Sequence, residues 1–501
     1  MNADLGLSTD PASARPLYRQ IVDQVSARIH EGTLPAGFRL PATRALAQAL
    51  GTNRSTVVAA FRELAEGGLL VSTVGRGTFV ADRPAVTPRR PTTSRELSWA
   101  SLVSNTTRTG ILHELDRLGR RVAGGDHINL QRMEPSSDLL PLDAFRRCVQ
   151  HVMRTRGGVA LGYAPREGLA RLRGAIAEDL ARRGVPTHAE NILVTTGSQQ
   201  ALDLVARILV DPGETILVQD ATYTGAIHVL SAAGARVVGV PNDDEGPDID
   251  ALERLGRSGA KGLYVMPGGQ NPTGRTISAA RREHLVAWSH HHGIPLIEDD
   301  YCADLELDSV TLPPALRTLD SQVLHVGTFS KRLIPALRIG YLVCPPALRQ
   351  HLTVLKHAMD LGSSLLLQHA LAEFLERGYL RTHLTRILAE YRRRRDTLEA
   401  GLTRHMPRSV RWTRATRGLT TWLTLPPGVD SEEIFDAALD RGVVVAPDVL
   451  FSVDGQERGL RLTFCREPPR RLAEGAKRLG LAMRAVMRRN DVAPGSGLGP
   501  V

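Results

Sequence analysis

The chain has 501 residues, enough for two to four domains at about 150 residues per domain. Hydrophobic residues make up 42% and charged residues 23%, which disfavours a disordered, collagen-like or membrane protein. The formal charge is +10, and residues 1–95 contain 12 arginines and no lysine against seven acidic residues, a net charge of +5. This excess indicates a nucleic-acid partner at the N-terminus.

The sequence contains no apolar segment of the signal-peptide type near its start and no stretch of 18 uncharged apolar residues. We therefore expect a cytoplasmic protein with no membrane partner. The four cysteines lie far apart and form no CxxC pair, so neither a disulfide scaffold nor a metal site is expected.

The first segment, residues 14–82, has the pattern of three helices followed by a hairpin. The predicted elements are helices over 17–29, 42–50 and 54–66 and strands over 69–73 and 78–81. This order predicts a winged helix-turn-helix, whose third helix enters the major groove of DNA. Arg54, Ser55, Thr56 and Arg76 are then candidate DNA contacts. The alternative is that these arginines only solvate a three-helix bundle.

The same segment resembles the GntR family of regulators in the run LPATRALAQALGTNRSTVVAAFRELAEGGLL and in the wing VGRGTFVA. The resemblance implies binding to double-stranded operator DNA, adds Arg44 to the contacts, and places Gly75–Thr78, including Gly77, at the tip of the wing. Val58 departs from the pattern, because some relatives have an arginine there. Base specificity at that position stays open.

Residues 83–125 are predicted to be a linker. They begin RPAVTPRRPTTS, a mixture of proline, threonine and arginine that is typical of extended tethers, and a short helix is expected near 111–122. The large domain is expected over residues 126–490. The Gly/Pro-rich tail at 491–501 is predicted to be disordered.

The large domain alternates apolar runs with helix-length segments. The runs lie at 192–196, 215–219, 237–240, 263–266, 295–298, 323–326 and 339–343. Buried strands separated by helices predict an α/β fold with a seven-stranded, mostly parallel sheet. A helix over 379–402 and short strands near 422–425, 443–446 and 460–464 predict a smaller C-terminal α+β lobe.

Polar motifs follow several predicted strands, at the edge where ligands bind in open α/β sheets. They are TGSQQ at 196–200, DATY at 220–223, GGQNPTG at 268–274, EDDY at 298–301 and TFSK at 328–331, with Arg338 beyond the last. The first offers backbone N–H groups to an anion. The adjacent carboxylates of Glu298, Asp299 and Asp300 would repel one another unless at least one meets a cation.

Together these motifs provide what pyridoxal phosphate needs: a lysine for an imine, a carboxylate for the ring nitrogen, donors for the phenolate oxygen, an aromatic face and groups for the phosphate. The chain has four lysines. Lys356 and Lys477 are expected on solvated helices and Lys261 precedes a strand. Lys331 is therefore the predicted attachment lysine.

The large domain resembles the fold type I, class I aminotransferases, and the whole chain resembles MocR-type regulators of the GntR family. The resemblance implies that Lys331 forms the internal aldimine with the cofactor, that Asp299 pairs with the pyridine nitrogen and that Arg461 clamps a substrate carboxylate. The remaining implied cofactor contacts are Tyr223 on the ring, Asn271 and Tyr301 at the phenolate oxygen, and Gly197, Ser198, Gln199, Thr328, Ser330 and Arg338 at the phosphate. Tyr163 would come from the partner subunit of a homodimer.

The sequence departs from the family patterns at two positions, which limits how far the family's residue roles can be assigned here. In many aminotransferases the aspartate lies three residues before the tyrosine, and here that position is Glu298, so the choice between Glu298 and Asp299 stays open. The QNPTG motif is closer to active aminotransferases than to many MocR relatives, which leaves transamination open.

Two charged runs have structural explanations. His290, His291 and His292 are successive residues that cannot all face one metal ion from a helix, so we interpret them as a helix C-terminus. The run from Arg392 to Arg395 is interpreted as a charged helix face. A second DNA-binding patch is the alternative for this run.

The resulting hypothesis is a transcriptional regulator that senses pyridoxal phosphate or an amino compound through Lys331. The rival hypotheses are a working aminotransferase whose N-terminal module only mediates interactions, and a scaffold that binds no cofactor.

Overall fold

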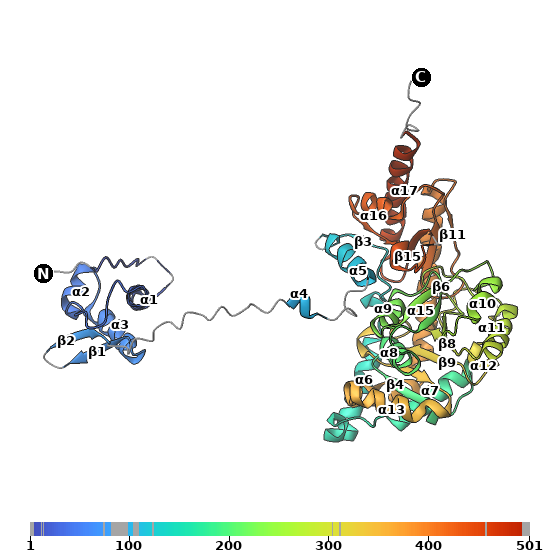
Figure 1. Cartoon of the computed structure of the whole chain (residues 1–501), viewed down its shortest axis with the longest axis horizontal. Coiled ribbons are helices and arrows are strands. Elements are labelled where there is room, and N and C mark those ends of the chain that lie inside the picture. The colour runs from blue at the N-terminus through green and yellow to red at the C-terminus, as the bar shows by residue number, and fades with distance from the viewer. Residues whose placement is uncertain are drawn as a thin grey trace. The chain divides into compact units, whose positions relative to one another are not determined.

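The structure is a computed structural model of the chain. It describes residues 5–11, 13, 15–73, 76–81, 99–103, 110–122, 125–302, 304–309, 312–455 and 458–492. Two compact units make up the chain, and the boundary between them falls after Leu102. Figure 1 labels their elements. Among the described residues, no helix is long and apolar enough to cross a bilayer.

The N-terminal unit is a winged helix-turn-helix, as predicted. Its elements are α1 (Leu17–His30), α2 (Thr43–Ala49), α3 (Arg54–Glu66), β1 (Leu70–Thr73), β2 (Gly77–Val80) and the short helix α4 (Trp99–Leu102). β1 and β2 are antiparallel, with Leu70 opposite Val80. Ile21, Val25, Val57 and Phe61 are buried in one core with the hairpin, because the apolar residues of α1 and α3 recur at helical spacing.

The large unit is built on the predicted seven-stranded sheet. Its strands are β4 (Ile192–Thr195), β5 (Thr215–Gln219), β6 (Arg236–Val240), β7 (Leu263–Val265), β8 (Leu296–Asp300), β9 (Leu324–Thr328) and β10 (Gly340–Val343). The order is β4-β10-β9-β8-β7-β5-β6, and β10 alone is antiparallel to its neighbours β4 and β9. The carboxyl ends of the parallel strands therefore meet at one edge.

Helices cover both faces of this sheet. Successive strand residues point to opposite faces, so Leu193 packs in a different core from Ile192 and Val194. This is why the strands read as continuous apolar runs in the sequence. The helices of the unit are α5 (Gly110–Arg121), α6 (Leu142–Arg156), α7 (Ala170–Arg182), α8 (Ser198–Leu209), α9 (Thr224–Ala232), α10 (Ile249–Gly256), α11 (Ala279–His292), α12 (Leu316–Leu319), α13 (Pro346–Asp360), α14 (Leu365–Glu376), α15 (Tyr379–His405), α16 (Ser431–Leu439) and α17 (Pro469–Val492).

The C-terminal lobe has a second sheet in the order β11-β12-β15-β14. Its strands are β11 (Arg411–Trp412), β12 (Thr420–Thr424), β14 (Ala446–Pro447) and β15 (Gly459–Thr463). β13 (Val443–Val444) pairs in parallel with β3 (Ile128–Asn129), so the first strand of the large unit belongs to the C-terminal lobe. α15 and α17 pack side by side in this lobe.

The helix expected near 111–122 is α5, and it is attached to the large unit. Arg117 pairs with Glu432 of α16 at 2.6 Å, and Arg121 pairs with Asp436 of the same helix. Most of the remaining predicted linker, including residues 83–98, lies outside the described residues, as does the predicted tail apart from Asp491 and Val492 at the end of α17.

The two charged runs of the sequence, the histidines of α11 and the arginines of α15, have different surroundings in the structure. His290, His291 and His292 form the last turn of α11, which Gly293 ends in a left-handed conformation at φ 66°. The run from Arg392 to Arg395, interpreted as a charged helix face, is only half on the surface, because Arg394 and Arg395 of α15 are buried. Arg394 pairs with Glu390 and donates to the carbonyl of Cys465, and Arg395 pairs with Asp308.

Candidate functional site

A cavity of about 580 Å³ lies at the carboxyl edge of the parallel strands. It brings together residues that lie far apart in the chain, from Gly119 to Arg461. The predicted cofactor and substrate residues that line it are Ser198, Gln199, Tyr223, Asn271, Asp299, Tyr301, Thr328, Ser330, Lys331, Arg338 and Arg461. The motifs that follow separate strands therefore converge on one site, as expected for an open α/β sheet.

Lys331 follows β9 and projects into this cavity. Its Nζ donates a hydrogen bond to the carbonyl of Met133 at 2.6 Å. Burial lowers the pKa of Lys331 below its usual value, and the positive charges of Arg461 and Arg338 act in the same direction. A lowered pKa increases the fraction of neutral amine, which is the nucleophilic form.

The other three lysines have different environments. Lys261 pairs with Glu214, and Lys477 lies on an exposed face of α17. Lys356 is buried and pairs with Asp360, so the expectation that it is solvated is wrong. It does not line the cavity of Lys331.

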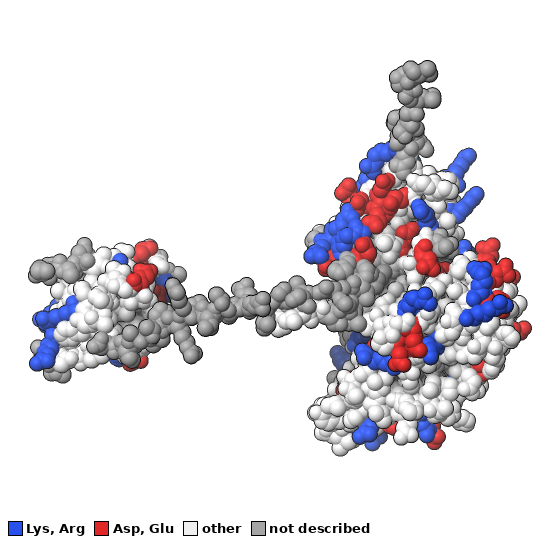
Figure 2. All heavy atoms as spheres, viewed as in Figure 1, with Lys and Arg blue, Asp and Glu red and all other residues white. Residues whose placement is uncertain are grey.

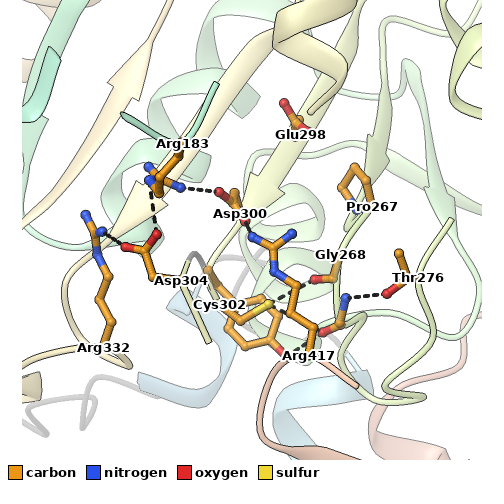
Figure 3. Close-up of polar contacts among 12 residues, drawn as sticks. Arg183, Pro267, Gly268, Thr276, Glu298, Asp300, Cys302, Asp304, Arg332 and Arg417 are labelled. Carbon is orange, nitrogen blue, oxygen red and sulfur yellow. Dashed lines mark hydrogen bonds and ion pairs between the residues drawn. The ribbon is translucent and has the colours of Figure 1, made fainter. Parts of the chain in front are cut away.

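The three adjacent carboxylates of β8 have three different surroundings. Glu298 accepts hydrogen bonds from His325 Nδ1 at 2.9 Å and from the backbone N–H groups of Leu316 and Arg317. Asp300 lies between Arg183 at 2.8 Å and Arg417 at 3.0 Å (Figure 3). Asp299, between them in sequence, points to the other face of the sheet and lines the cavity.

The contacts around Asp300 form a buried network of alternating charges (Figure 3). Arg183 also lies 3.6 Å from Asp304, and Asp304 pairs with Arg332, which is fully buried. Burial alone would raise the pKa of Asp300, but the guanidinium groups of Arg417 and Arg183 hold it well below its usual value. The network joins β8 to the C-terminal end of α7 and to the loop before β12, on the face of the sheet opposite to Asp299.

Asp299 is held differently from its neighbours. The hydroxyl of Tyr264 donates to Oδ2 at 2.7 Å, whereas Oδ1 is buried and has no hydrogen-bond partner among the described residues. Burial raises the pKa of Asp299 to about 7. A buried, unpaired carboxylate oxygen that faces a cavity is suited to a cationic N–H group of a ligand.

This environment predicts a pH effect on the cofactor-free protein. The folded pKa is raised from 3.8 to about 7, so the contribution of Asp299 to stability is fully present below pH 3.8 and is lost as pH rises through 7. We expect Asp299→Asn to be more stable than the parent above pH 7, by up to about 4 kcal/mol, with the difference shrinking towards pH 5. Thermal midpoints of both proteins at pH 5 and pH 8 test this, and a gap that does not change with pH would contradict it.

Close packing shapes the phosphate end of the predicted cofactor site. Gly197 has φ 79° just before α8, and a Cβ there would lie 2.7 Å from a guanidinium nitrogen of Arg338. Only glycine therefore lets Arg338 approach the N-terminus of α8. Thr328 donates to Ser330 at 3.1 Å beside them. We find no ion-pair or hydrogen-bond partner for the Arg338 guanidinium in the described part of the chain, which leaves it available for an anion.

Arg461 of β15 is the second guanidinium in the cavity. It donates to Asn271 Oδ1 at 2.9 Å and to the carbonyl of Gln131 at 2.6 Å, and it stacks on Phe451. Burial lowers its pKa to about 10. No carboxylate among the described residues pairs with it, so a ligand carboxylate can take that place.

Two tyrosines of the cavity also have hydrogen-bond partners. Tyr301 donates to the carbonyl of Gly269 at 2.7 Å, and Tyr223 donates to Gln199 at 3.2 Å.

Asn129, Gln131, Arg132 and Met133, at the end of β3 and just after it, also line the cavity and were not singled out by the sequence. β3 pairs with β13 of the C-terminal lobe rather than with the main sheet. The rule about strand ends in the main sheet therefore did not identify them. The only available signal was the polar pair Gln131 and Arg132 between two apolar residues.

Tyr163 lies away from the cavity of its own chain. Its side chain is 85% exposed, and it follows the short helix η3 (Gly157–Leu161). Val159 and Leu161 of η3 are also more than 60% exposed. An exposed apolar group of this kind is typical of an interface with another molecule.

The predicted DNA contacts all belong to the N-terminal unit, on α2, on α3 and beside the hairpin. Arg44 of α2 and Arg54 and Ser55 at the start of α3 are exposed, and Thr56 is partly exposed. Arg76 is exposed beside the hairpin, where Gly77 has φ 118°. Basic side chains gather at one edge of this unit, at the left of Figure 2.

Comparisons with known proteins agree with both parts of the chain. Residues 127–479 match the family described as Aminotransferase class I and II, and residues 17–80 match the bacterial regulatory proteins of the gntR family. The HTH-type transcriptional regulator YdfD of Bacillus subtilis is 30% identical over 95% of this chain and 98% of its own. A protein of Rhizobium meliloti named for rhizopine catabolism, the regulatory protein MocR, is 31% identical over 94% of each chain.

A solved structure extends the comparison to the cavity-bearing unit. LysN of Thermus thermophilus, an alpha-aminoadipate aminotransferase complexed with N-(5'-phosphopyridoxyl)-L-leucine, has a TM-score of 0.72 and 32% identity. The match covers 78% of this chain and all of LysN.

The cofactor of the aminotransferase family is pyridoxal phosphate, and the cavity fits it. Lys331 supplies an amine, the unpaired Oδ1 of Asp299 suits the ring nitrogen, and Arg338 beside Gly197 suits the phosphate. The chain belongs to the class I and II aminotransferase family and, through its winged helix, to the GntR family of regulators, in the combination known as MocR-type.

Proposed function

We propose that this protein is a transcriptional regulator that binds double-stranded DNA and senses pyridoxal phosphate or an amino compound through Lys331. The observation that carries the proposal is a cavity with an amine, an unpaired carboxylate and two guanidinium groups in the same chain as a winged helix-turn-helix. A regulator needs both a DNA-binding unit and a unit whose state depends on a ligand.

Each residue of the cavity would bind a different part of pyridoxal phosphate. When bound, pyridoxal phosphate supplies an aldehyde that condenses with amines. Lys331 would hold its aldehyde carbon, Asp299 would keep its ring nitrogen protonated and Tyr223 would lie on its ring. Asn271 and Tyr301 would donate to its phenolate oxygen. Its phosphate would be bound by Gly197, Ser198, Gln199, Thr328, Ser330 and Arg338.

An incoming amine would displace Lys331, and Arg461 would hold the carboxylate of that amine. The displaced Lys331 amine is then free to accept or return a proton, because its pKa is already lowered by burial. Asn271 accepts from Arg461 through Oδ1, and its Nδ2 can still donate to the phenolate oxygen. Tyr301 would have to release the carbonyl of Gly269 to donate there.

We further propose a homodimer in which Tyr163 of each chain completes the site of the other. The exposed apolar side chains of Val159 and Leu161, just before it in the chain, support a second copy as the partner. A ligand that binds one arrangement of the dimer better than another would shift the relation of the two DNA-binding units.

A working aminotransferase is the second candidate. It is favoured by the likeness of the large unit to LysN and by the complete set of an attachment lysine and a carboxylate in the cavity. In that case the winged helix would serve interactions other than operator binding.

Footprinting with and without amines separates the two functions. We expect the protein to protect a specific DNA fragment, and amines that change the absorption band of the cofactor to change that protection. Sustained conversion of amino and keto acids at enzyme-like rates, without specific protection of any DNA, would favour the enzyme.

A substitution in the DNA-binding unit tests its proposed contact with DNA. Arg54→Ala at the N-terminus of α3 should weaken binding to the protected fragment about 5- to 100-fold, because one base or phosphate contact is lost. Arg62→Ala is the matched control, since Arg62 lies on the same helix, is 76% exposed and pairs with Glu66. Gel-shift titrations at two salt concentrations measure both. Equal effects of the two substitutions would move the interface away from the start of α3.

A further inference from the structure

Arg132 occupies a special place on the wall of the cofactor cavity. The carbonyl of Gln131, the residue before it, accepts from Arg461 Nη2 at 2.6 Å. The carbonyl of Met133, the residue after it, accepts from Lys331 Nζ at 2.6 Å. Arg132 thus lies between the contacts of the two groups that would hold the carboxylate and the amine of a ligand.

The backbone of Arg132 is fixed while its side chain is not. Its N–H donates to Asn129 Oδ1 at 2.8 Å, and its carbonyl accepts from the hydroxyl of Thr463 at 3.1 Å. Thr463 lies on β15, two residues after Arg461. The side chain is exposed at the cavity. A rigid backbone keeps the Cα of Arg132 at a constant position relative to Arg461, and its free side chain can then reach a ligand in the cavity.

The charges around Arg132 leave it unpaired. A neighbouring cavity of about 940 Å³, which Arg132 also lines, contains four acidic residues. Each of them pairs with another arginine: Asp126 and Glu467 with Arg471, Glu134 with Arg466, and Asp138 with Arg394. Within the described ranges, no acidic side chain pairs with Arg132.

The cofactor cavity itself has an excess of positive charge. Arg132, Lys331, Arg338 and Arg461 line it, against Asp299 as the acidic residue on its wall. A phosphate at Arg338 and one carboxylate at Arg461 would leave the guanidinium of Arg132 without an anion. Guanidinium groups bind carboxylates through two parallel hydrogen bonds, which makes them selective for that shape.

We propose that Arg132 is a specificity-determining residue that selects amino acids with a second carboxylate on the side chain. The inference rests on the proposed function, because it assumes that an amine enters the cavity and meets Lys331. It goes further by naming the class of that amine. The α-carboxylate would lie on Arg461 and the side-chain carboxylate on Arg132.

Spectral titration of the cofactor-loaded, full-length protein tests this. Three pairs of L-amino acids, each an acid and its neutral partner, cover three chain lengths: aspartate and asparagine, glutamate and glutamine, and 2-aminoadipate and norleucine. We expect the parent protein to bind at least one acid about 10-fold or more tightly than its neutral partner, as charge-assisted hydrogen bonds require.

Arg132→Met removes the charge but keeps most of the side-chain volume. It should weaken the preferred acid about 10- to 100-fold and leave its neutral partner within about 3-fold. Arg132→Lys should restore part of the preference, since it keeps the charge without the two-pronged geometry. Arg132→Gln serves in place of the methionine variant if that variant does not fold. Arg488→Met is the control, because Arg488 is exposed on α17 and lines neither cavity.

The outcomes separate the inference from the proposed function. If the parent responds to amines but prefers no acid over its neutral partner, or if Arg132→Met leaves the ratio of the two affinities unchanged, the inference is overturned and the proposed function stands. If the parent binds the cofactor and its spectrum responds to no amine, amine sensing fails, and the inference fails with it.

Discussion

Lys331→Ala is expected to abolish covalent attachment of pyridoxal phosphate. Lys331 follows β9 and lines the cavity, so its amine can reach the cofactor. Burial lowers the pKa of this amine, which increases the fraction in the neutral, nucleophilic form. Borohydride reduction of the parent should label a peptide that spans residues 328–338. The variant should give no labelled peptide and should lose the absorption band of the attached cofactor near the visible edge of the spectrum.

A matched lysine variant is the control for this experiment. Lys477→Ala removes an exposed lysine of α17 that pairs with Glu474 at 4.0 Å. It should keep both the band and the label. An unchanged band in Lys331→Ala, or a label on a peptide that contains Lys356, would show that another lysine holds the cofactor. No band and no label in the parent would remove the basis of the proposed function.

Asp300→Asn is expected to cost about 3–5 kcal/mol of stability, the second large effect. Asp300 accepts from Arg183 at 2.8 Å and from Arg417 at 3.0 Å, and all three side chains are nearly buried. Loss of the central carboxylate leaves two guanidinium groups close together with too little negative charge. The midpoint of urea denaturation of the cofactor-free protein measures the loss.

Two variants show whether this effect is specific. Glu190→Gln disrupts an exposed pair with Arg349 at 3.4 Å and should cost less than about 1 kcal/mol. Asp299→Asn, the neighbouring substitution, should leave the protein folded and weaken cofactor binding about 10- to 100-fold, because it removes the partner of the ring nitrogen. A reversal of the two aspartate phenotypes would exchange the roles assigned to Asp299 and Asp300.

Much of the fold could be predicted from local patterns. The apolar spacing between Leu17 and Ile29 and the glycines of the wing define a winged helix, because each element depends on nearby residues. The seven strands were recognisable because parallel strands are buried on both faces and are apolar throughout. Lys331 could be chosen because the chain has four lysines and one of them follows a strand beside two hydroxyl residues.

Other features depended on long-range packing. The sequence left Glu298 and Asp299 as alternatives, and the pleat of β8 turns one towards His325 and the other into the cavity. Lys356 was expected to be solvated and Arg394 and Arg395 to lie on a charged helix face, yet all three are buried. Burial of these charges is possible because each has an acidic partner: Asp360, Glu390 and Asp308.

The sequence by itself determined the family, the two units and the chemistry of the attachment lysine, since these follow from motifs within short stretches of chain. The tertiary structure decided which carboxylate faces the cavity and that Arg132 reaches it. The first depends on neighbouring strands, which bring His325 to Glu298 and Tyr264 to Asp299. The second arises where segments hundreds of residues apart meet, as Gln131 meets Arg461. Such contacts depend on strand direction and packing, and no local spacing of residues encodes them.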